Sequence, residues 1–215
     1  MDLEIQTARI ESFTLPIFYA YNVITDEECE ELIRRCKQSE WADVTRGAFA
    51  SVNKSWLDDS PYKQRFEIVF GDFARGLMRI EQCKFRIGSS WATKTIQGGF
   101  SGLHEHKNYY FSSVLYLTEG ARIMFRSPFK DNPNYVFDHV EDNPFNVMTM
   151  FLEPPKNAML LFPSFMEHGI AMHDGNTERY SIAMNFQPYG TFGKHDSIIT
   201  AVSYTHLTLP TICSV

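Results

Sequence analysis

The sequence predicts a mainly β fold, a β-sandwich or jelly roll with two N-terminal helices packed on its outer face. Two observations support this prediction. Before residue 81, apolar residues recur at helical spacing in two stretches; after residue 83, about eight short apolar or alternating runs follow without a helical pattern between them. Consecutive strands without intervening helices disfavour a parallel α/β fold.

The first helix should begin after Thr25. Thr25 and Glu28 have the spacing of a capping box, and acidic residues suit the positive end of a helix. A stripe of apolar residues then recurs at helical spacing: Cys29, Leu32, Ile33 and Cys36. We expect both cysteines to be small core residues, with a redox pair as the alternative.

A second helix is expected within residues 61–80, because Pro61 suits a first turn and apolar residues recur at three- and four-residue steps. These residues are Phe66, Val69, Phe70, Phe73 and Leu77. Such a stripe is typical of a helix face that packs on a core.

The predicted strands are separated by turn residues such as Gly-Gly, Asn-Pro and Asp-Gly-Asn. Their ranges are 83–87, 89–96, 111–117, 121–125, 146–152, 158–162, 168–172 and 180–186. The polar segment 129–146 is expected to be an excursion between strands that could lie over the mouth of a site.

The chain of 215 residues is expected to form one domain over residues 1–201, with helical support at about 25–80 and a β core at about 83–188. Residues 202–215 are expected to be a non-native or disordered tail outside the fold. The net charge of -6 without a basic cluster argues against nucleic acid as a partner.

Export and membrane insertion are not expected either. The N-terminus carries acids where a signal peptide carries bases, and about 18 consecutive apolar residues occur nowhere. The four cysteines have no CxxC spacing, which favours reduced thiols in a cytoplasm.

The stretch GLHEHKNYYFSS at 102–113 contains two histidines that flank a glutamate. In an extended chain, His104 and His106 share a face and Glu105 points the opposite way. The two histidines are candidate metal ligands, and the alternative is that they are ordinary polar residues at the start of a strand. A zincin motif is excluded, because residue 108 is Asn where HExxH requires His.

A second group of candidates lies between His168 and the last predicted strand. Arg179 follows His168 by 11 residues, and strand alternation places four residues on one face: Arg179, Ser181, Ala183 and Asn185. This column suits a carboxylate ligand, whereas the alternative is a surface arginine at a strand start. For Asn185 and Tyr116, the alternative is a structural role, in which either side chain supplies a hydrogen bond within a buried strand or packs in the core. We expect His139 and His173 to face solvent.

Together, these motifs resemble those of the Fe(II)- and 2-oxoglutarate-dependent oxygenases. The matching pieces are Trp91, His104, His106, Val114–Leu117, the FRSP corner, Phe162–Ser164, His168, Arg179, Ser181 and Asn185. The resemblance covers roughly residues 83–188 and is greatest to an oxygenase group common in marine microbes and their phages. More loosely, ITDEECEELI resembles the opening helix of prolyl 4-hydroxylase-like members.

The resemblance implies a double-stranded β-helix, a cupin-like jelly roll, in which His104, His106 and His168 hold Fe(II) and leave positions for 2-oxoglutarate and O₂. It also implies that Arg179 and Ser181 bind the far carboxylate of 2-oxoglutarate. Further cofactor-binding candidates are Asn185 and Tyr116. Because His106 stands where the family usually has a carboxylate, zinc or another cupin-like site is an alternative. Glu105 could replace His106 only if the strand were irregular.

The resemblance therefore implies a dioxygenase that hydroxylates an unidentified peptide, amino acid or small molecule and releases succinate and CO₂. One alternative is a three-histidine cupin that uses no 2-oxoglutarate and acts on a small thiol or diketone. Another is a non-catalytic β-sandwich binding module. Arg179 discriminates against the cupin, since the chemistry of that cupin needs no carboxylate anchor. The expected location is the cytoplasm, of a host cell if the gene is carried by a phage.

Overall fold

The computed structural model of the chain describes residues 15–81, 83–128, 140–141 and 147–202. Within these ranges the chain forms two α-helices, eleven strands and one 3₁₀ turn at His195–Ser197. The elements are β1 Phe18–Ala20, α1 Asp26–Lys37, β2 Trp41–Thr45, β3 Ala48–Ser51, α2 Lys63–Gly76, β4 Lys84–Thr95, β5 Phe111–Tyr116, β6 Ile123–Arg126, β7 Thr149–Leu152, β8 Met159–Pro163, β9 His168–Ile170, β10 Arg179–Phe192 and β11 Ile199–Ala201.

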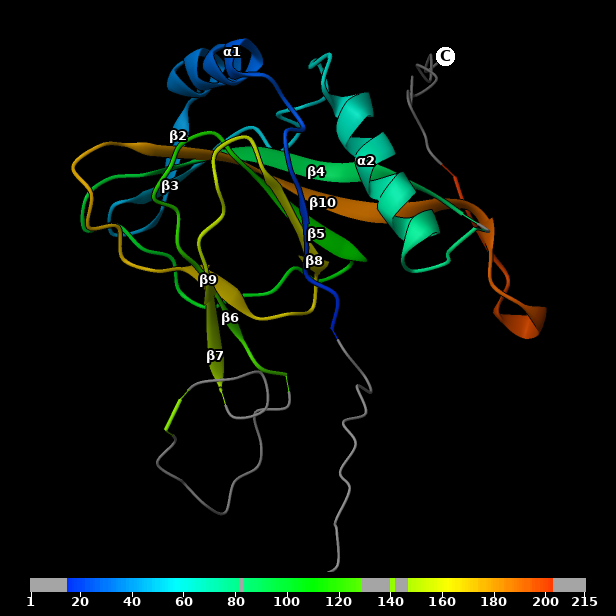
Figure 1. The fold of residues 1–215 in the computed structure, drawn as a ribbon. Helices are drawn as coiled ribbons and strands as arrows, with labels where there is room; N and C mark the ends of the chain where they lie inside the picture. Colours follow the sequence, from blue (N-terminus) through cyan, green and yellow to red (C-terminus); the bar gives the residue numbers. More distant parts are fainter. Residues whose placement is uncertain (1–14, 82, 129–139, 142–146, 203–215) are drawn as a thin grey trace, which may run out of the picture.

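The strands form two antiparallel sheets (Figure 1). The larger sheet has the order β1-β8-β5-β10-β4-β3-β2, with β11 paired to β10, and the smaller sheet has the order β7-β6-β9. Both α1 and α2 lie against the outer face of the larger sheet, and the smaller sheet lies on the opposite side. The predicted mainly β fold with helices on its outer face is confirmed.

Helix α1 begins as the sequence predicts. The Thr25 N–H donates to Glu28 Oε2 at 2.9 Å, and the Glu28 N–H donates to Thr25 Oγ1 at 3.3 Å, which completes the capping box. The stripe packs on the core through Cys29, Leu32 and Cys36. Both cysteines are free thiols, and burial raises the pKa of Cys36 to about 12, so the core interpretation is confirmed.

Helix α2 packs its aromatic stripe on the same core. Phe66, Phe70 and Phe73 are buried, and the ring of Phe70 stacks on Phe186 of β10 with centroids 4.4 Å apart. The prediction for Leu77 is wrong, because the helix ends at Gly76 and leaves the Leu77 side chain 65% exposed.

The predicted strands 83–87 and 89–96 form the single strand β4. Gly88 does not end a strand; the pairing of β4 with β10 shifts by one residue there, which is a β-bulge. A Cβ on Gly88 would lie 2.9 Å from both the Tyr109 and Gln187 side chains, so a larger residue would force these side chains to shift. Strands β1, β2 and β3 are short and were not among the predicted strands.

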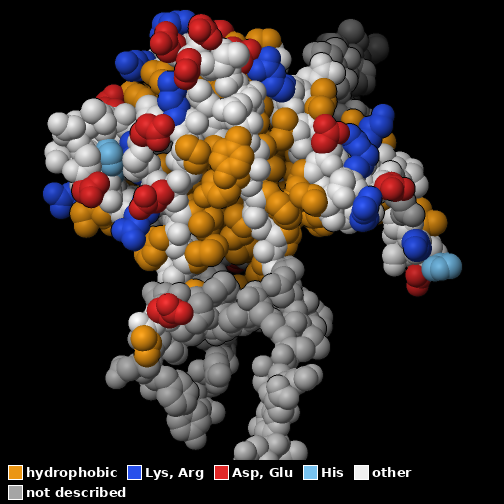
Figure 2. All heavy atoms as spheres, viewed as in Figure 1, with side chains coloured by type: hydrophobic (Ala, Val, Ile, Leu, Met, Phe, Trp, Pro, Cys, Tyr) orange, Lys and Arg blue, Asp and Glu red, His pale blue; other side chains and the backbone are white. Residues whose placement is uncertain are grey.

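Two clusters of apolar side chains hold the layers together. One joins the helices to the outer face of the larger sheet, and the other, smaller cluster includes Val114 and Phe162 from the larger sheet and Ile123 and Phe125 from β6. Charged side chains gather over α1 (Figure 2). An apolar area lies below α1 in the same view, at the position of β1 in Figure 1.

No described helix is both long and apolar enough to cross a membrane. Most of the predicted excursion 129–146 and nearly all of the predicted tail 202–215 lie outside the described residues.

Candidate active site

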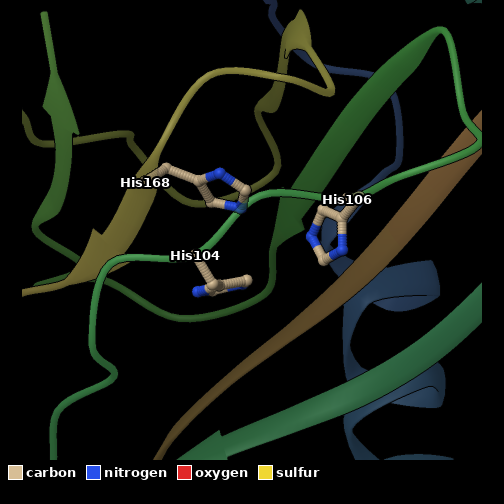
Figure 3. Close-up of side chains that lie close together, drawn as sticks. All are labelled: His104, His106 and His168. Atoms are coloured by element: carbon tan, nitrogen blue, oxygen red, sulfur yellow. The ribbon is translucent and has the colours of Figure 1, made fainter.

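Three histidines come together between the two sheets. Their candidate ligand atoms all lie within 4.8 Å of one another, although His104 and His106 precede β5 whereas His168 begins β9. Figure 3 shows the three imidazoles around a common space. The ring centroids lie 4.5 Å apart for His104 and His168, and 5.1 Å apart for His106 and each of the other two.

Glu105 lies outside this group of histidines. Its carboxylate Oε1 lies 2.5 Å from the Nζ of Lys107, and both side chains are at least partly exposed. The segment from His104 to Asn108 is not a continuous strand, yet the two histidines still share one side of it. The geometry therefore favours His106 over Glu105 as the third candidate metal ligand.

Main-chain oxygens fix the ring nitrogens of two of the histidines. The Nδ1 of His104 lies 3.0 Å from the Gly102 carbonyl oxygen, and the Nδ1 of His168 lies 2.8 Å from the Met166 carbonyl oxygen. A carbonyl can only accept, so each Nδ1 carries the proton and donates it. The Nε2 lone pair of each ring is therefore left to bind a metal ion.

Burial keeps two of the rings neutral. Desolvation, followed by repulsion from His104, lowers the pKa of His106 to about 4. Desolvation also lowers the pKa of His168 to about 3, although the Met166 carbonyl opposes the shift. Neutral imidazole is the form that binds metal ions, so both rings have this form at neutral pH.

A cavity of about 120 Å³ extends from the histidines along the inner face of the larger sheet. The predicted column on β10 lines it with Arg179, Ser181, Ala183 and Asn185, as the alternation of side chains requires. The paired residues of β4 are, in the same order, Thr95, Thr93, Trp91 and Ser89. The ring centroids of Trp91 and His106 lie 5.4 Å apart. The part of the column around Ala183, which pairs with Trp91, is therefore the end near the histidines.

Arg179 lies at the other end of the column and is only 6% exposed. Its Nη1 donates to the Gly120 carbonyl oxygen at 2.8 Å, and its buried Nε has no hydrogen-bond partner among the described residues. Among the described residues no carboxylate forms a salt bridge with Arg179, and burial lowers the pKa of its guanidinium. The interpretation as a surface arginine is therefore wrong.

Three hydroxyl-bearing residues line the cavity together with Arg179: Ser181, Thr93 and Tyr116. The Ser181 and Thr93 hydroxyl oxygens lie 2.5 Å apart across the β10–β4 pair. Tyr116, opposite Ser181 on β5, is fully buried, and within the described part of the chain its hydroxyl has no hydrogen-bond partner. Burial raises the pKa of Tyr116, so its hydroxyl is a protonated, unused donor.

Asn185 lies at the histidine end of the column, where its amide contacts protein groups. Its Oδ1 accepts from the Ser112 hydroxyl at 2.7 Å, and its Nδ2 donates to the Ser89 hydroxyl at 3.1 Å. Sequence reasoning did not identify Ser112 or Ser89, because a serine in a strand carries no signal of its partners. Phe111, which follows the two histidines in the sequence, belongs to the core under α2.

His173 is buried, contrary to the prediction that it faces solvent. Its main chain exchanges hydrogen bonds with two glycines: its N–H donates to the Gly99 carbonyl, and its carbonyl accepts from Gly98. Its Nε2 lies 2.7 Å from the Thr177 carbonyl oxygen. Gly175 has no side chain to block the ring, since a Cβ there would lie 2.7 Å from His173 Cε1. His139 lies outside the described residues.

One protein-family model matches part of the sequence. Residues 89–185 match the family model described as "Putative 2OG-Fe(II) oxygenase". No curated protein matches the sequence.

Solved structures share the fold at low sequence identity. A Pseudomonas putida prolyl-4-hydroxylase is 15% identical, with a TM-score of 0.55 over 81% of this chain and 93% of that one. HygX from Streptomyces hygroscopicus, with nickel and 2-oxoglutarate bound, is 11% identical, with a TM-score of 0.59 over 80% of this chain and 83% of that one.

A 2OG-Fe(II) oxygenase family oxidoreductase from Burkholderia pseudomallei is 12% identical, with a TM-score of 0.55 over 79% of this chain and 83% of that one. These likenesses confirm the predicted double-stranded β-helix. The matched segment 89–185 contains every candidate site residue predicted from the sequence. Through that segment, which is less than half of the chain, the sequence is similar to the 2OG-Fe(II) oxygenase family.

Proposed function

We propose that this domain is a dioxygenase in which His104, His106 and His168 hold Fe(II) and Arg179 anchors 2-oxoglutarate. The overall reaction consumes 2-oxoglutarate, O₂ and a substrate C–H bond, and yields a hydroxylated substrate, succinate and CO₂. The substrate is a peptide, an amino acid or another small molecule.

The buried guanidinium of Arg179 is the observation that supports this function over a plain metal-binding cupin. A buried charge is costly unless it is paired, and among the described residues Arg179 has only a neutral carbonyl partner. A carboxylate ligand supplies the missing counter-charge through charge-assisted hydrogen bonds. A cupin that uses no dicarboxylate, or a non-catalytic module, has no need of such a group.

The donor set fits a divalent metal ion. Three imidazoles from two segments converge, two of them have an Nε2 lone pair available, and two have a depressed pKa. Three neutral ligands on one side of a metal ion leave other positions open. Bound Fe(II) supplies the activation of O₂ and the one-electron chemistry that a side chain cannot provide.

The remaining residues bind and orient the co-substrate. Arg179 and Ala183 are four residues apart on β10, which corresponds to about 13 Å at roughly 3.3 Å per residue. The Arg179 end would hold one carboxylate, with the Ser181 and Tyr116 hydroxyls as further donors. The small side chain of Ala183 leaves space toward the histidines. Apolar walls such as Val114 and Phe162 exclude water from this path.

We also propose a cytoplasmic location and no nucleic-acid partner. The free thiols of Cys29, Cys36 and Cys83 support a reducing compartment. The net charge of -6 supports the second point.

Anaerobic titration of the Fe(II)-loaded protein with 2-oxoglutarate tests the proposal. Chelation of Fe(II) by the 2-oxo acid should produce a visible charge-transfer band that saturates at one equivalent. Succinate, which lacks the 2-oxo group, is the matched control and should produce no band. If 2-oxoglutarate gives no band although Fe(II) is bound, the oxygenase proposal is wrong and a three-histidine cupin is the better interpretation.

A further inference from the structure

A chain of buried hydrogen bonds connects the larger sheet to the corner after β8. Ser112 of β5 donates its only hydroxyl proton to Asn185 Oδ1 at 2.7 Å. The hydroxyl oxygens of Ser112 and Ser164 lie 2.9 Å apart, so Ser164 must be the donor in that pair. Asn185 in turn donates to Ser89 of β4 at 3.1 Å. Ser112, Asn185 and Ser164 are at most 2% exposed, so water does not compete for their hydrogen-bonding groups.

The corner at residues 164–166 contacts two of the three histidines through its main chain. The carbonyl of Ser164 accepts the N–H of His106 at 2.9 Å. The carbonyl of Met166 lies 2.8 Å from Nδ1 of His168. A shift of this corner would therefore move His106 and rotate the ring of His168 at the same time.

We propose that Asn185, Ser112 and Ser164 are positioning residues that fix this corner and thereby set the distance between His106 and His168. The inference rests on the proposed metal site. It gives Asn185 a different role from the cofactor contact predicted from the sequence, because serine hydroxyls engage both the carbonyl and the amino group of its side chain. Groups that hydrogen-bond around metal ligands commonly tune metal affinity in this way.

Co(II) binding to the 2-oxoglutarate-free protein is the direct test, because it isolates the histidine site and needs no turnover. Ser112→Ala and Ser164→Ala should each weaken Co(II) binding by about 10- to 100-fold, measured by competition with a chelator. The visible spectrum of bound Co(II) should also change, because it reports the arrangement of the ligands. A merely structural contribution would lower the melting temperature without altering that spectrum.

Ser113→Ala is the matched control. Ser113 is the next residue on β5 and is equally buried, but it lies opposite Met184 and Leu161, and its hydroxyl has no partner in the residues that the structure describes. Its removal should leave both the Co(II) affinity and the spectrum unchanged.

Two further variants sharpen the test. The double variant Ser112→Ala/Ser164→Ala should lose no more affinity than the weaker-binding single variant, because the two residues act in one chain. Asn185→Ala should weaken Co(II) binding before any 2-oxoglutarate is added. If it lowers only the affinity for 2-oxoglutarate, Asn185 is a cofactor contact and its positioning role is wrong.

Two other outcomes have separate meanings. If the wild type binds Co(II) and both serine variants match it in affinity and spectrum, the positioning inference is overturned while the metal site stands. If the folded wild type binds no Co(II), the proposed metal site itself fails, and the inference fails with it.

Discussion

His104 and His168 lie directly opposite each other and exchange both of their main-chain hydrogen bonds. Each N–H donates to the carbonyl of the other residue at 2.9 Å, which is the hydrogen-bonded pair of an antiparallel ladder. The ladder continues at Ser101, whose N–H donates to Ile170 and whose hydroxyl accepts from the N–H of Ile170. Main-chain register therefore places these two histidines side by side before any metal binds.

Gly169 makes this close pairing possible, which leads to the first prediction. A Cβ on Gly169 would lie 2.8 Å from the Ser101 carbonyl and 3.0 Å from that of Gly102. Gly169→Ala should push the two segments apart, lower the free energy of unfolding by about 1–3 kcal/mol and weaken metal binding. Urea unfolding and Co(II) titration measure the two effects.

Gly102→Ala is the control for that variant. A Cβ on Gly102 would have no described heavy atom within 4 Å apart from those of its chain neighbours, so the substitution should leave metal binding intact. Equal Co(II) affinities in the two alanine variants would show that the ladder does not set the histidine spacing.

The second prediction concerns the third metal ligand. Glu105→Gln should retain the metal, since its carboxylate lies beside Lys107 and apart from the three rings. His106→Ala should lose most of it, because two protein ligands hold a divalent ion weakly. Metal content after dialysis measures both. The opposite pattern, with metal lost from Glu105→Gln and kept in His106→Ala, would transfer the ligand to Glu105.

The third prediction is a pH dependence of the metal-free protein. The pKa of His168 is about 3 in the folded chain, whereas an unfolded histidine has a pKa of about 6.5. Below pH 6.5 the unfolded state therefore binds a proton that the folded state does not bind, and stability falls as the pH falls. From pH 6.5 to 5 this histidine alone should lower the free energy of unfolding by about 2 kcal/mol.

His168→Phe removes the titrating group while keeping a ring in the same place. In urea unfolding at the two pH values, the loss of stability on acidification should be about 2 kcal/mol smaller in this variant than in the wild type. An equal loss in both proteins would mean that His168 is not the group responsible.

The sequence patterns that predict the fold and the candidate site correctly are local and periodic. The capping box at Thr25, the aromatic stripe of α2 and the alternation from Arg179 to Asn185 each follow from the geometry of one element. The convergence of His104, His106 and His168 was predicted only through a family resemblance, because strand spacing does not reveal which strands become neighbours.

The incorrect and missing predictions also have physical causes. Gly88 was predicted to separate two strands, but a glycine within a strand can equally mark a β-bulge. The difference depends on the packing of Tyr109 and Gln187 around Gly88, which the local sequence does not reveal. His173 was predicted to face solvent because it lies in turn sequence. Its ring is buried instead, because the absence of a side chain at Gly175 leaves room for it in the interior. The links from Ser112 to Asn185 and Ser164 join residues 73 and 52 positions apart, which no local pattern reports.

The last prediction concerns Arg179 and separates an oxygenase from a plain metal-binding cupin. Arg179→Met keeps much of the side-chain volume and removes the charge and every donor, so Fe(II) should still bind. The affinity for 2-oxoglutarate should fall by about 10- to 150-fold, since a hydrogen bond to a charged group contributes about 1.5–3 kcal/mol. Anaerobic titration of the charge-transfer band measures this loss.

Stability distinguishes a ligand-binding arginine from a structural one. In the cofactor-free wild type, Arg179 is a buried charge with no ionic partner among the described side chains, so an apolar residue of similar volume should not lower the melting temperature. Arg122→Met, at an exposed arginine paired with Glu153, is the control and should keep wild-type 2-oxoglutarate affinity. If Arg179→Met titrates like the wild type, or loses stability together with Fe(II), then the buried guanidinium supports the fold and another group must bind 2-oxoglutarate.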